Sequence, residues 1–151
     1  MSIDFDIIIV GSGLGGAATA FELSKKGYTA LIIERGKWPH RDQDDWNPDK
    51  ILIDSLYKAS SPDKVQQYDR AESNLYPNEV LGGSSVFYGG AAFRLRANDF
   101  NSWPLNYNDF ESYYSLAEKL MNVHGDDSLD TCAPKRNRPY PYSSPQLSLP
   151  A

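Results

Sequence analysis

A short glycine-rich sequence near the N-terminus constrains the fold of this chain more than any other feature. Residues 11–16 read GSGLGG, directly after the apolar run IIIV at 7–10 and before a stretch of helical periodicity that ends at Gly27. A second apolar run, ALII at 30–33, is followed at once by Glu34. A glycine-rich turn between a strand and a helix, then a second strand ending at an acidic residue, predicts a dinucleotide-binding β-α-β unit.

Each glycine of this first glycine cluster has an expected physical role. Gly11 permits the tight turn out of the strand, Gly13 lets the backbone approach a pyrophosphate, and Gly16 allows close packing of helix and sheet. The N–H groups and positive dipole end of the helix that starts near Gly13 supply an anion site. The Glu34 carboxylate can accept hydrogen bonds from ribose hydroxyls and repels a 2′-phosphate, which favours FAD or NAD over NADP.

The middle of the chain shows a second glycine-rich segment after a long irregular one. We expect buried parallel strands at 6–10 and 28–33, whereas residues 36–78 show no clear period and are interrupted by prolines. We interpret 36–78 as an irregular covering. The second glycine cluster, LGGSSVFYGG at 81–90, lets backbone approach a ligand closely, with a plain turn as the alternative.

The last third predicts one helix and an extended tail. A helix is expected from Asn106 to Val123, started by Asn108 with Glu111 and stopped by Gly125. Proline-rich residues 131–151 predict an extended or disordered segment, or one that awaits a partner surface. The apolar side chains of the helix recur on one face, which we expect to be core: Phe110, Tyr113, Tyr114, Ala117, Leu120 and Met121.

Composition narrows the class of protein. The formal charge of −5 and pI near 4.9 argue against a nucleic-acid or anionic-membrane partner, because no basic patch is present. No apolar run approaches the roughly 20 residues of a membrane span, so we expect a cytoplasmic protein. Cys132 is the single cysteine, which excludes an intrachain disulfide and a cysteine zinc site. We expect no metal site.

Three segments together resemble the N-terminal part of the glucose-methanol-choline (GMC) family of FAD-dependent oxidoreductases. They are the GSGLGG cluster with its IIERG strand end at 32–36, the LGGSSVFYGG cluster, and DFNSWP at 99–104 before the aromatic helix. The resemblance covers most of residues 5–125. It implies an incomplete Rossmann-like α/β fold with a parallel sheet, in which 1–130 form the N-terminal part of an FAD-binding domain and 131–151 lead toward a missing remainder.

The resemblance also implies which residues hold FAD. The pyrophosphate would contact Gly11, Gly13, Leu14 and Gly16, with Gly15 beside them. The ribose would contact Glu34. The adjacent Arg35 could instead pair with a 2′-phosphate, which keeps NADP as a reservation. The flavin half would contact Gly82, Gly83, Ser84, Tyr88, Gly89 and Gly90. Tyr88 stands where many members have Asn, and Phe87 where a few have the His that attaches FAD covalently, so we expect noncovalent FAD.

The family reaction is oxidation of a CH–OH donor, an alcohol or sugar, by hydride transfer to flavin N5. Its active-site His lies near the C-terminal end of a much longer chain. His40 and His124 are expected to be surface residues, so we assign no catalytic residue here. We therefore expect an FAD-binding portion that is inactive alone and is cut short or completed by a second polypeptide.

Two alternatives stay open at this point. One is a catalytically silent nucleotide-binding or interaction module whose proline-rich tail docks on a partner. The other is an NAD-binding Rossmann domain, since the first glycine cluster by itself does not separate NAD from FAD.

Overall fold

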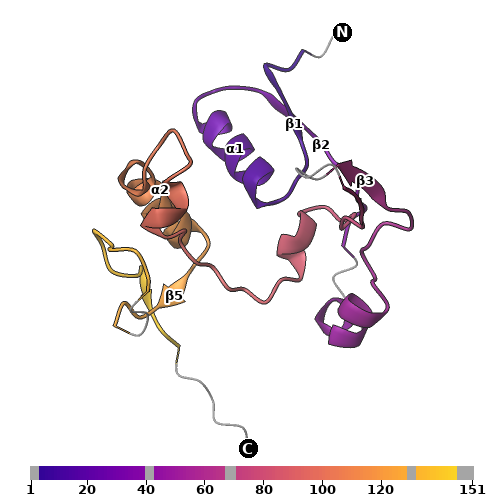
Figure 1. Ribbon diagram of the computed structural model, residues 1–151. Coiled ribbons are helices and arrows are strands. Elements are labelled where there is room, and N and C mark those ends of the chain that lie inside the picture. Colours follow the sequence, from indigo (N-terminus) through magenta and orange to yellow (C-terminus); the bar gives the residue numbers. More distant parts are fainter. Residues whose placement is uncertain (1–3, 40–42, 67–70, 129–131, 146–151) are drawn as a thin grey trace, which may run out of the picture. The chain divides into compact units, whose positions relative to one another are not determined.

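The computed structural model describes residues 4–39, 43–66, 71–128 and 132–145, which form two compact units (Figure 1). Unit 1 spans Met1–Gly90 and holds both glycine clusters. Unit 2 spans Ala91–Ala151 and holds the aromatic helix.

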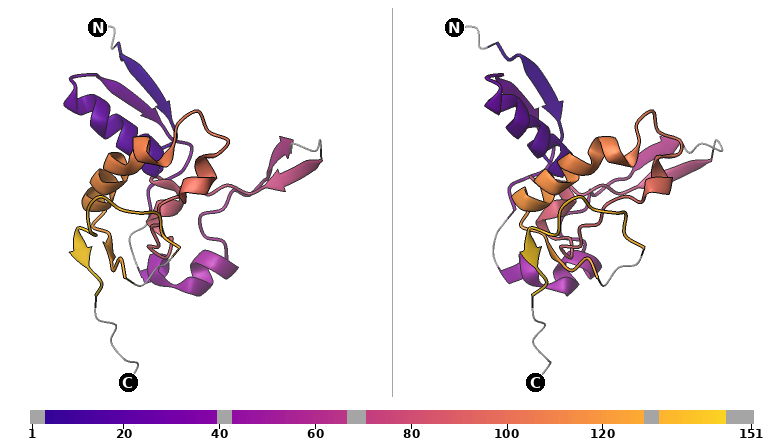
Figure 2. Two further views of the ribbon diagram at one scale, coloured as in Figure 1. Left: turned by 60° about the vertical axis from the view of Figure 1, so that its left-hand side comes forward. Right: turned by 90° about the vertical axis from the view of Figure 1, so that its left-hand side faces the viewer.

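Unit 1 begins with the β-α-β unit that the sequence predicts. Strand β1 (Ile7–Val10) pairs in parallel with β2 (Ala30–Ile33), with Ile7 opposite Ala30, and helix α1 (Leu14–Lys25) connects them. Figure 2 shows α1 alongside the two strands. The chain leaves α1 through Gly27, whose φ of 86° is the left-handed conformation expected of a helix end.

Only one face of this two-stranded sheet is covered. Along β1, Ile7 and Ile9 are half-buried, whereas Ile8 and Val10 on the opposite face are 62% and 84% exposed. None of the residues of α1 is buried. The parallel Rossmann-like architecture is therefore present but incomplete among the described residues, as expected, because parallel sheets are ordinarily covered on both faces.

The segment between the two glycine clusters contains more regular structure than its sequence predicts. It includes a short 3-10 helix (Gln43–Trp46), a π-helical turn (Asp49–Ile53) and an antiparallel hairpin of β3 (Asp63–Gln66) and β4 (Glu72–Leu75). The two hairpin strands are mostly exposed and largely polar. Without a buried face they have no alternating pattern for sequence analysis to detect.

Residues 79–81 return the chain to the end of β2 and bring Val80 into the core of unit 1, which also contains Tyr57 and Ala59. Lys37 pairs with Val80 in a parallel bridge, and the N–H of Leu81 donates to the carbonyl of Lys37 at 2.8 Å. Val80 is completely buried. A Cβ on Gly36 would lie 2.1 Å from the backbone nitrogen of Val80, so this close approach requires glycine.

Unit 2 is built around helix α2 (Tyr107–Leu120). A 3-10 helix at Ala97–Phe100 precedes it, and the ring of Phe100 packs against Trp103, Tyr107 and Phe110 at centroid distances of 5.3 to 6.2 Å. The short strands β5 (His124–Gly125) and β6 (Tyr142–Ser143) pair in parallel.

The predicted core face of α2 is wrong for most of its residues. Tyr113 is 68% exposed and Leu120 is 57% exposed, and the buried residues of the helix are Tyr107, Glu111 and Glu118. The two glutamates are buried because Arg94, whose side chain is 2% exposed, pairs with both at 3.0 and 2.8 Å. A buried carboxylate is stable only when it is paired and hydrogen-bonded.

The predicted signals for the ends of α2 were also wrong by a few residues. Asn106, not Asn108, caps the helix: its side chain accepts from the N–H of Asn108, and Asp109 accepts from the N–H of Asn106 at 2.8 Å. This is a reciprocal capping box. The helix ends before Asn122, which adopts a positive φ of 56°, rather than at Gly125.

The described part of the proline-rich tail packs within unit 2. Arg136 pairs with Glu118 and Asp127, and its guanidinium carbon lies 3.7 Å from the ring centroid of Tyr140. The N–H of Asn137 donates to Glu111 at 3.1 Å. Residues 132–145 are thus held by the same carboxylates that Arg94 neutralises, while the domain boundary at residue 131 stays a prediction.

Candidate functional site

The first glycine cluster has the backbone geometry that its sequence predicts. Gly11 follows β1 with φ at +93°, a backbone conformation that residues other than glycine rarely adopt. A Cβ on Gly16 would lie 2.0 Å from the carbonyl oxygen of Gly11. The start of α1 therefore packs directly on the end of β1 only because residue 16 is glycine.

The N-terminus of α1 is suited to an anion. Gly13 occupies the N-cap in an extended conformation without a side-chain cap, and the first turn, which contains Leu14, Gly15 and Gly16, holds no acidic residue. The first N–H groups of a helix lack partners within the helix, and they carry its positive dipole end. This end of α1 is therefore electrostatically favourable for phosphate.

Glu34 lies just beyond β2 and is held by three hydrogen bonds. Its Oε2 accepts from the N–H of Ser12 at 2.9 Å and from the Ser12 hydroxyl at 2.6 Å, and its Oε1 accepts from the N–H of Gly36 at 2.7 Å. The hydroxyl of Ser12, then the backbone N–H groups of Ser12 and Gly36, lower the pKa of Glu34 below its usual range. The carboxylate is therefore ionised at neutral pH.

The second glycine cluster lies directly against the first. The N–H of Gly82 donates to the hydroxyl oxygen of Ser12 at 2.8 Å, and a Cβ on Gly83 would lie 3.4 Å from the Cα of Gly13. Gly82 and Gly83 both have positive φ, at 94° and 63°. Two segments separated by 70 positions in the sequence thus form one backbone-rich wall.

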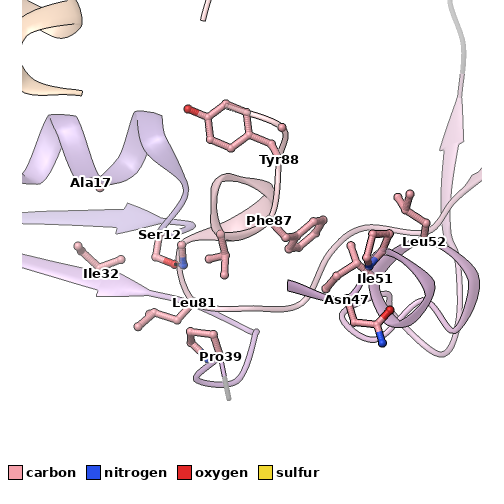
Figure 3. A pocket seen from close by; sticks show the side chains of 14 residues that line it. Ser12, Ala17, Ile32, Pro39, Asn47, Ile51, Leu52, Leu81, Phe87 and Tyr88 are labelled. Carbon is pink, nitrogen blue, oxygen red and sulfur yellow. Dashed lines mark hydrogen bonds between the residues drawn. The ribbon is translucent and has the colours of Figure 1, made fainter. Parts of the chain in front are cut away.

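A cavity of about 1070 Å³ adjoins this wall (Figure 3). Figure 3 shows Ser12 and Ile32 at one end and Ile51 and Leu52 at the other. Its volume lies slightly above the range of about 300–1,000 Å³ that is usual for small-molecule and cofactor sites. The residues of the second glycine cluster that line it are Leu81, Gly82, Val86, Phe87, Tyr88 and Gly89.

Of the predicted site residues, Gly82, Tyr88 and Gly89 line this cavity, and the others are not part of its lining. Ser84 belongs to the 3-10 helix Gly83–Val86, and its hydroxyl accepts from the side-chain amide of Asn78 at 2.8 Å. Gly90 follows the cavity-lining Gly89 and has a positive φ of 74°. Phe87 stacks on the buried ring of Tyr57 at 5.7 Å, which fixes one cavity side chain.

Arg35 is engaged away from the cavity. Its guanidinium pairs with Asp63 of the hairpin at 3.0 Å and with Glu79 at 3.5 Å. Those carboxylates supply the opposite charge that a ligand phosphate would otherwise provide. This pairing therefore weakens the case for Arg35 as a partner of the 2′-phosphate of NADP.

Titratable side chains with catalytic potential do not gather at this cavity in the part of the chain that the structure describes. His124 is exposed in β5, where its Nδ1 lies 2.8 Å from the carbonyl of Ser143. His40, expected at the surface, lies outside the described residues. Cys132 is exposed.

No group of three metal-binding side chains occurs among the residues described, and no helix there is long and apolar enough to cross a membrane.

Sequence analysis missed Ser12. It stands between two fingerprint glycines, where the motif accepts any residue, so the sequence carried no signal for it. Only the structure shows that its hydroxyl touches both Glu34 and Gly82.

Comparisons with known proteins agree with this geometry. Residues 9–39 match the family described as NAD(P)-binding Rossmann-like domain. The cholesterol oxidase of Acinetobacter baumannii is 40% identical over 131 residues, which cover 80% of this chain and 23% of that protein. The 6'''-hydroxyparomomycin C oxidase of Streptomyces lividus is 29% identical over 138 residues, covering 82% of this chain and 24% of that protein.

A solved structure has the same fold. An FAD-dependent oxidoreductase from Chaetomium thermophilum superposes with a TM-score of 0.57 at 20% identity, over 87% of this chain and 26% of that one. The fold and the site thus define a Rossmann-like dinucleotide-binding protein. With these relatives beside it, the chain belongs to the glucose-methanol-choline family of oxidoreductases and matches a part of its members. It spans about a quarter of the length of the curated relatives it matches.

Proposed function

We propose that this chain is the FAD-binding portion of an oxidoreductase that acts on CH–OH donors. The observation that carries the proposal is the contact between the two glycine clusters, through Ser12 and Gly82, beside one large cavity. Such a site suits an elongated ligand with a charged centre and a ring system at each end. Relatives named as oxidases, and a structural neighbour named as FAD-dependent, support the same assignment.

The residues present fit FAD. The first turn of α1 carries neither an acidic residue nor a side-chain cap, which leaves its positive end available to the pyrophosphate. Glu34 is an oriented carboxylate whose lowered pKa keeps it charged, as acceptance from ribose hydroxyls requires. Because Arg35 is already paired with Asp63 and Glu79, a 2′-phosphate would meet Glu34 without a free cation, which favours FAD over NADP.

We assign binding roles to three groups of residues. The first cluster would hold the pyrophosphate through Gly11, Gly13, Leu14, Gly15 and Gly16. Glu34, beside Arg35, would hold the ribose. The second cluster would hold the flavin half through Gly82, Gly83, Ser84, Tyr88, Gly89 and Gly90. Phe87 offers no atom for a covalent link, so binding is noncovalent.

When bound, the flavin supplies the redox chemistry, since its N5 accepts hydride from the carbon of an alcohol or sugar. The residues of this chain orient the flavin and keep water away from it. Phe87, fixed by its stacking on Tyr57, and Ile51 contribute apolar surface to the cavity. The group that takes the hydroxyl proton and the rest of the substrate site would come from further sequence or from a second polypeptide.

A cytoplasmic location is part of this proposal, and imaging a tagged protein in cells tests it.

The visible spectrum of the purified chain tests the proposal. We expect added FAD to show shifted flavin bands and quenched fluorescence, and denaturation to release unmodified FAD. Glu34→Gln should weaken binding about tenfold, because it removes a charged hydrogen-bond acceptor. Glu72→Gln, at an exposed position of strand β4, serves as the matched control and should bind as the natural chain does.

Two results would overturn it. A chain that leaves the FAD spectrum unchanged and binds NADH would be an NAD-binding Rossmann domain. A folded chain that binds neither dinucleotide, yet is captured by a partner through its proline-rich tail, would be an interaction module.

A further inference from the structure

Ser12 is the one side chain that connects the first glycine cluster, the end of β2 and the second glycine cluster by hydrogen bonds among the described residues. Its hydroxyl donates to Oε2 of Glu34 at 2.6 Å and accepts from the N–H of Gly82 at 2.8 Å. The residue is only 8% exposed, and it lines the cavity.

The direction of these bonds makes them mutually reinforcing. The ionised Glu34 orients the hydroxyl proton toward itself, and this turns an oxygen lone pair toward the N–H of Gly82. A hydrogen bond to a charged group is stronger than a neutral one, and it polarises the next bond in the chain. Gly36 holds the other carboxylate oxygen at 2.7 Å, so the whole arrangement has a fixed orientation.

We propose that Ser12 is a positioning residue that couples the adenosine side of the site to the flavin side. This inference rests on the proposed binding of FAD. Glu34 and the first cluster serve the adenosine diphosphate half of the ligand, and Gly82 opens the segment that serves the flavin half. Through Ser12, ordering of one half favours ordering of the other.

The two halves of the ligand should respond differently when the hydroxyl is removed. In Ser12→Ala the backbone N–H of residue 12 still donates to Glu34, so the carboxylate keeps two of its three hydrogen bonds. Gly82 loses the acceptor of its N–H altogether. A ligand that touches only the adenosine side should therefore lose little affinity, and a ligand that touches both sides should lose more.

Titrations with ADP and with FAD separate these effects. For Ser12→Ala we expect FAD to bind about tenfold more weakly and ADP less than about threefold more weakly. Ser12→Thr, which keeps the hydroxyl, should restore most of the FAD affinity. Ser24→Ala is the matched control, since the Ser24 hydroxyl donates only to the carbonyl of Phe21 within α1.

The outcomes distinguish this inference from the proposed function. If the natural chain binds FAD but Ser12→Ala weakens ADP and FAD equally, or neither, the coupling role is wrong while FAD binding stands. If the natural chain does not bind FAD, the proposed function itself fails.

Hydrogen exchange on the unmodified chain gives a second readout that does not depend on folding of the variants. We expect ADP, which lacks a flavin, to slow exchange of the Gly82 amide at least about threefold, because that amide is tied to Glu34 through Ser12. No change at Gly82 on ADP binding would contradict the inference.

Discussion

The glycine site of unit 1 and the charged core of unit 2 bring chain segments into contact in opposite ways. In unit 1 chain segments approach because side chains are absent, as where Gly16 meets Gly11 and Gly36 meets Val80. In unit 2 segments are joined by large charged side chains, with Arg94 between Glu111 and Glu118. The first arrangement leaves a cavity and free backbone groups for a ligand, whereas the second uses nearly all of its donors internally.

This comparison explains what each unit can do. Arg94 donates to Tyr107, Ser115 and both glutamates, so it offers no donor to a ligand. Desolvation opposes its charge, but these carboxylate and hydroxyl partners raise the pKa of Arg94 above its usual range. The charged groups of Arg94 and its partners are thus satisfied within unit 2, whereas the residues that line the cavity of unit 1 carry no formal charge.

The largest expected effect comes from filling the space at Gly16. We expect Gly16→Ala to lower the free energy of unfolding by at least about 4 kcal/mol and to abolish FAD binding, because its Cβ would overlap the carbonyl of Gly11. Urea unfolding and flavin fluorescence measure this. Gly15→Ala, with nothing within 4 Å of its Cβ, should unfold no more easily than the natural chain. Equal stability of the two variants would contradict the packing role.

The next effect tests the charged core. Arg94→Leu should destabilise unit 2 by about 3 kcal/mol, since it leaves the two buried carboxylates with Arg136 as their only cationic partner and with hydrogen bonds from Asn137 and Ser115. Chemical unfolding followed by circular dichroism measures the loss, with the exposed Arg138→Ala as the control. A loss below about 1 kcal/mol would show that these glutamates are not held by Arg94.

The sequence predicts contacts made through glycine backbone better than contacts made through charged side chains. Glycine reports backbone conformation directly, so the spacing of Gly11, Gly13 and Gly16 between the apolar runs at 7–10 and 30–33 predicted the β-α-β unit and its turn. The contact of the second cluster with the first depends on Ser12, whose hydroxyl has no sequence signal. For α2, periodicity predicted the helix correctly, but it placed Tyr113 in the core and missed Glu111, because the charge that buries Glu111 lies on Arg94, outside the helix.

Acid sensitivity should distinguish the carboxylate of the site. The folded state lowers the pKa of Glu34 below its ordinary 4.5, so its stabilising contribution is complete above that value and is lost as pH falls through the lowered pKa. Glu34→Gln should therefore show a shallower loss of stability than the natural chain below about pH 4.5. Thermal unfolding at a series of pH values measures the slopes. Identical slopes would contradict the observed hydrogen bonding of Glu34.

The smallest effect concerns the start of α2. Asn106→Ala should cost about 1 kcal/mol of stability, because it removes the cap that accepts from the N–H of Asn108. Asn108→Ala should cost no more than a few tenths of a kcal/mol, since that side chain does not provide the cap. The reverse order would favour the position that sequence analysis predicted.

If the two glycine clusters form one dinucleotide site, both should respond to FAD, and hydrogen exchange with and without FAD measures this. We expect FAD to slow amide exchange at residues 11–16 and at residues 82–90 together, over the same range of FAD concentration. Slower exchange at 11–16 alone, or no change at either cluster, would contradict a single site built from both.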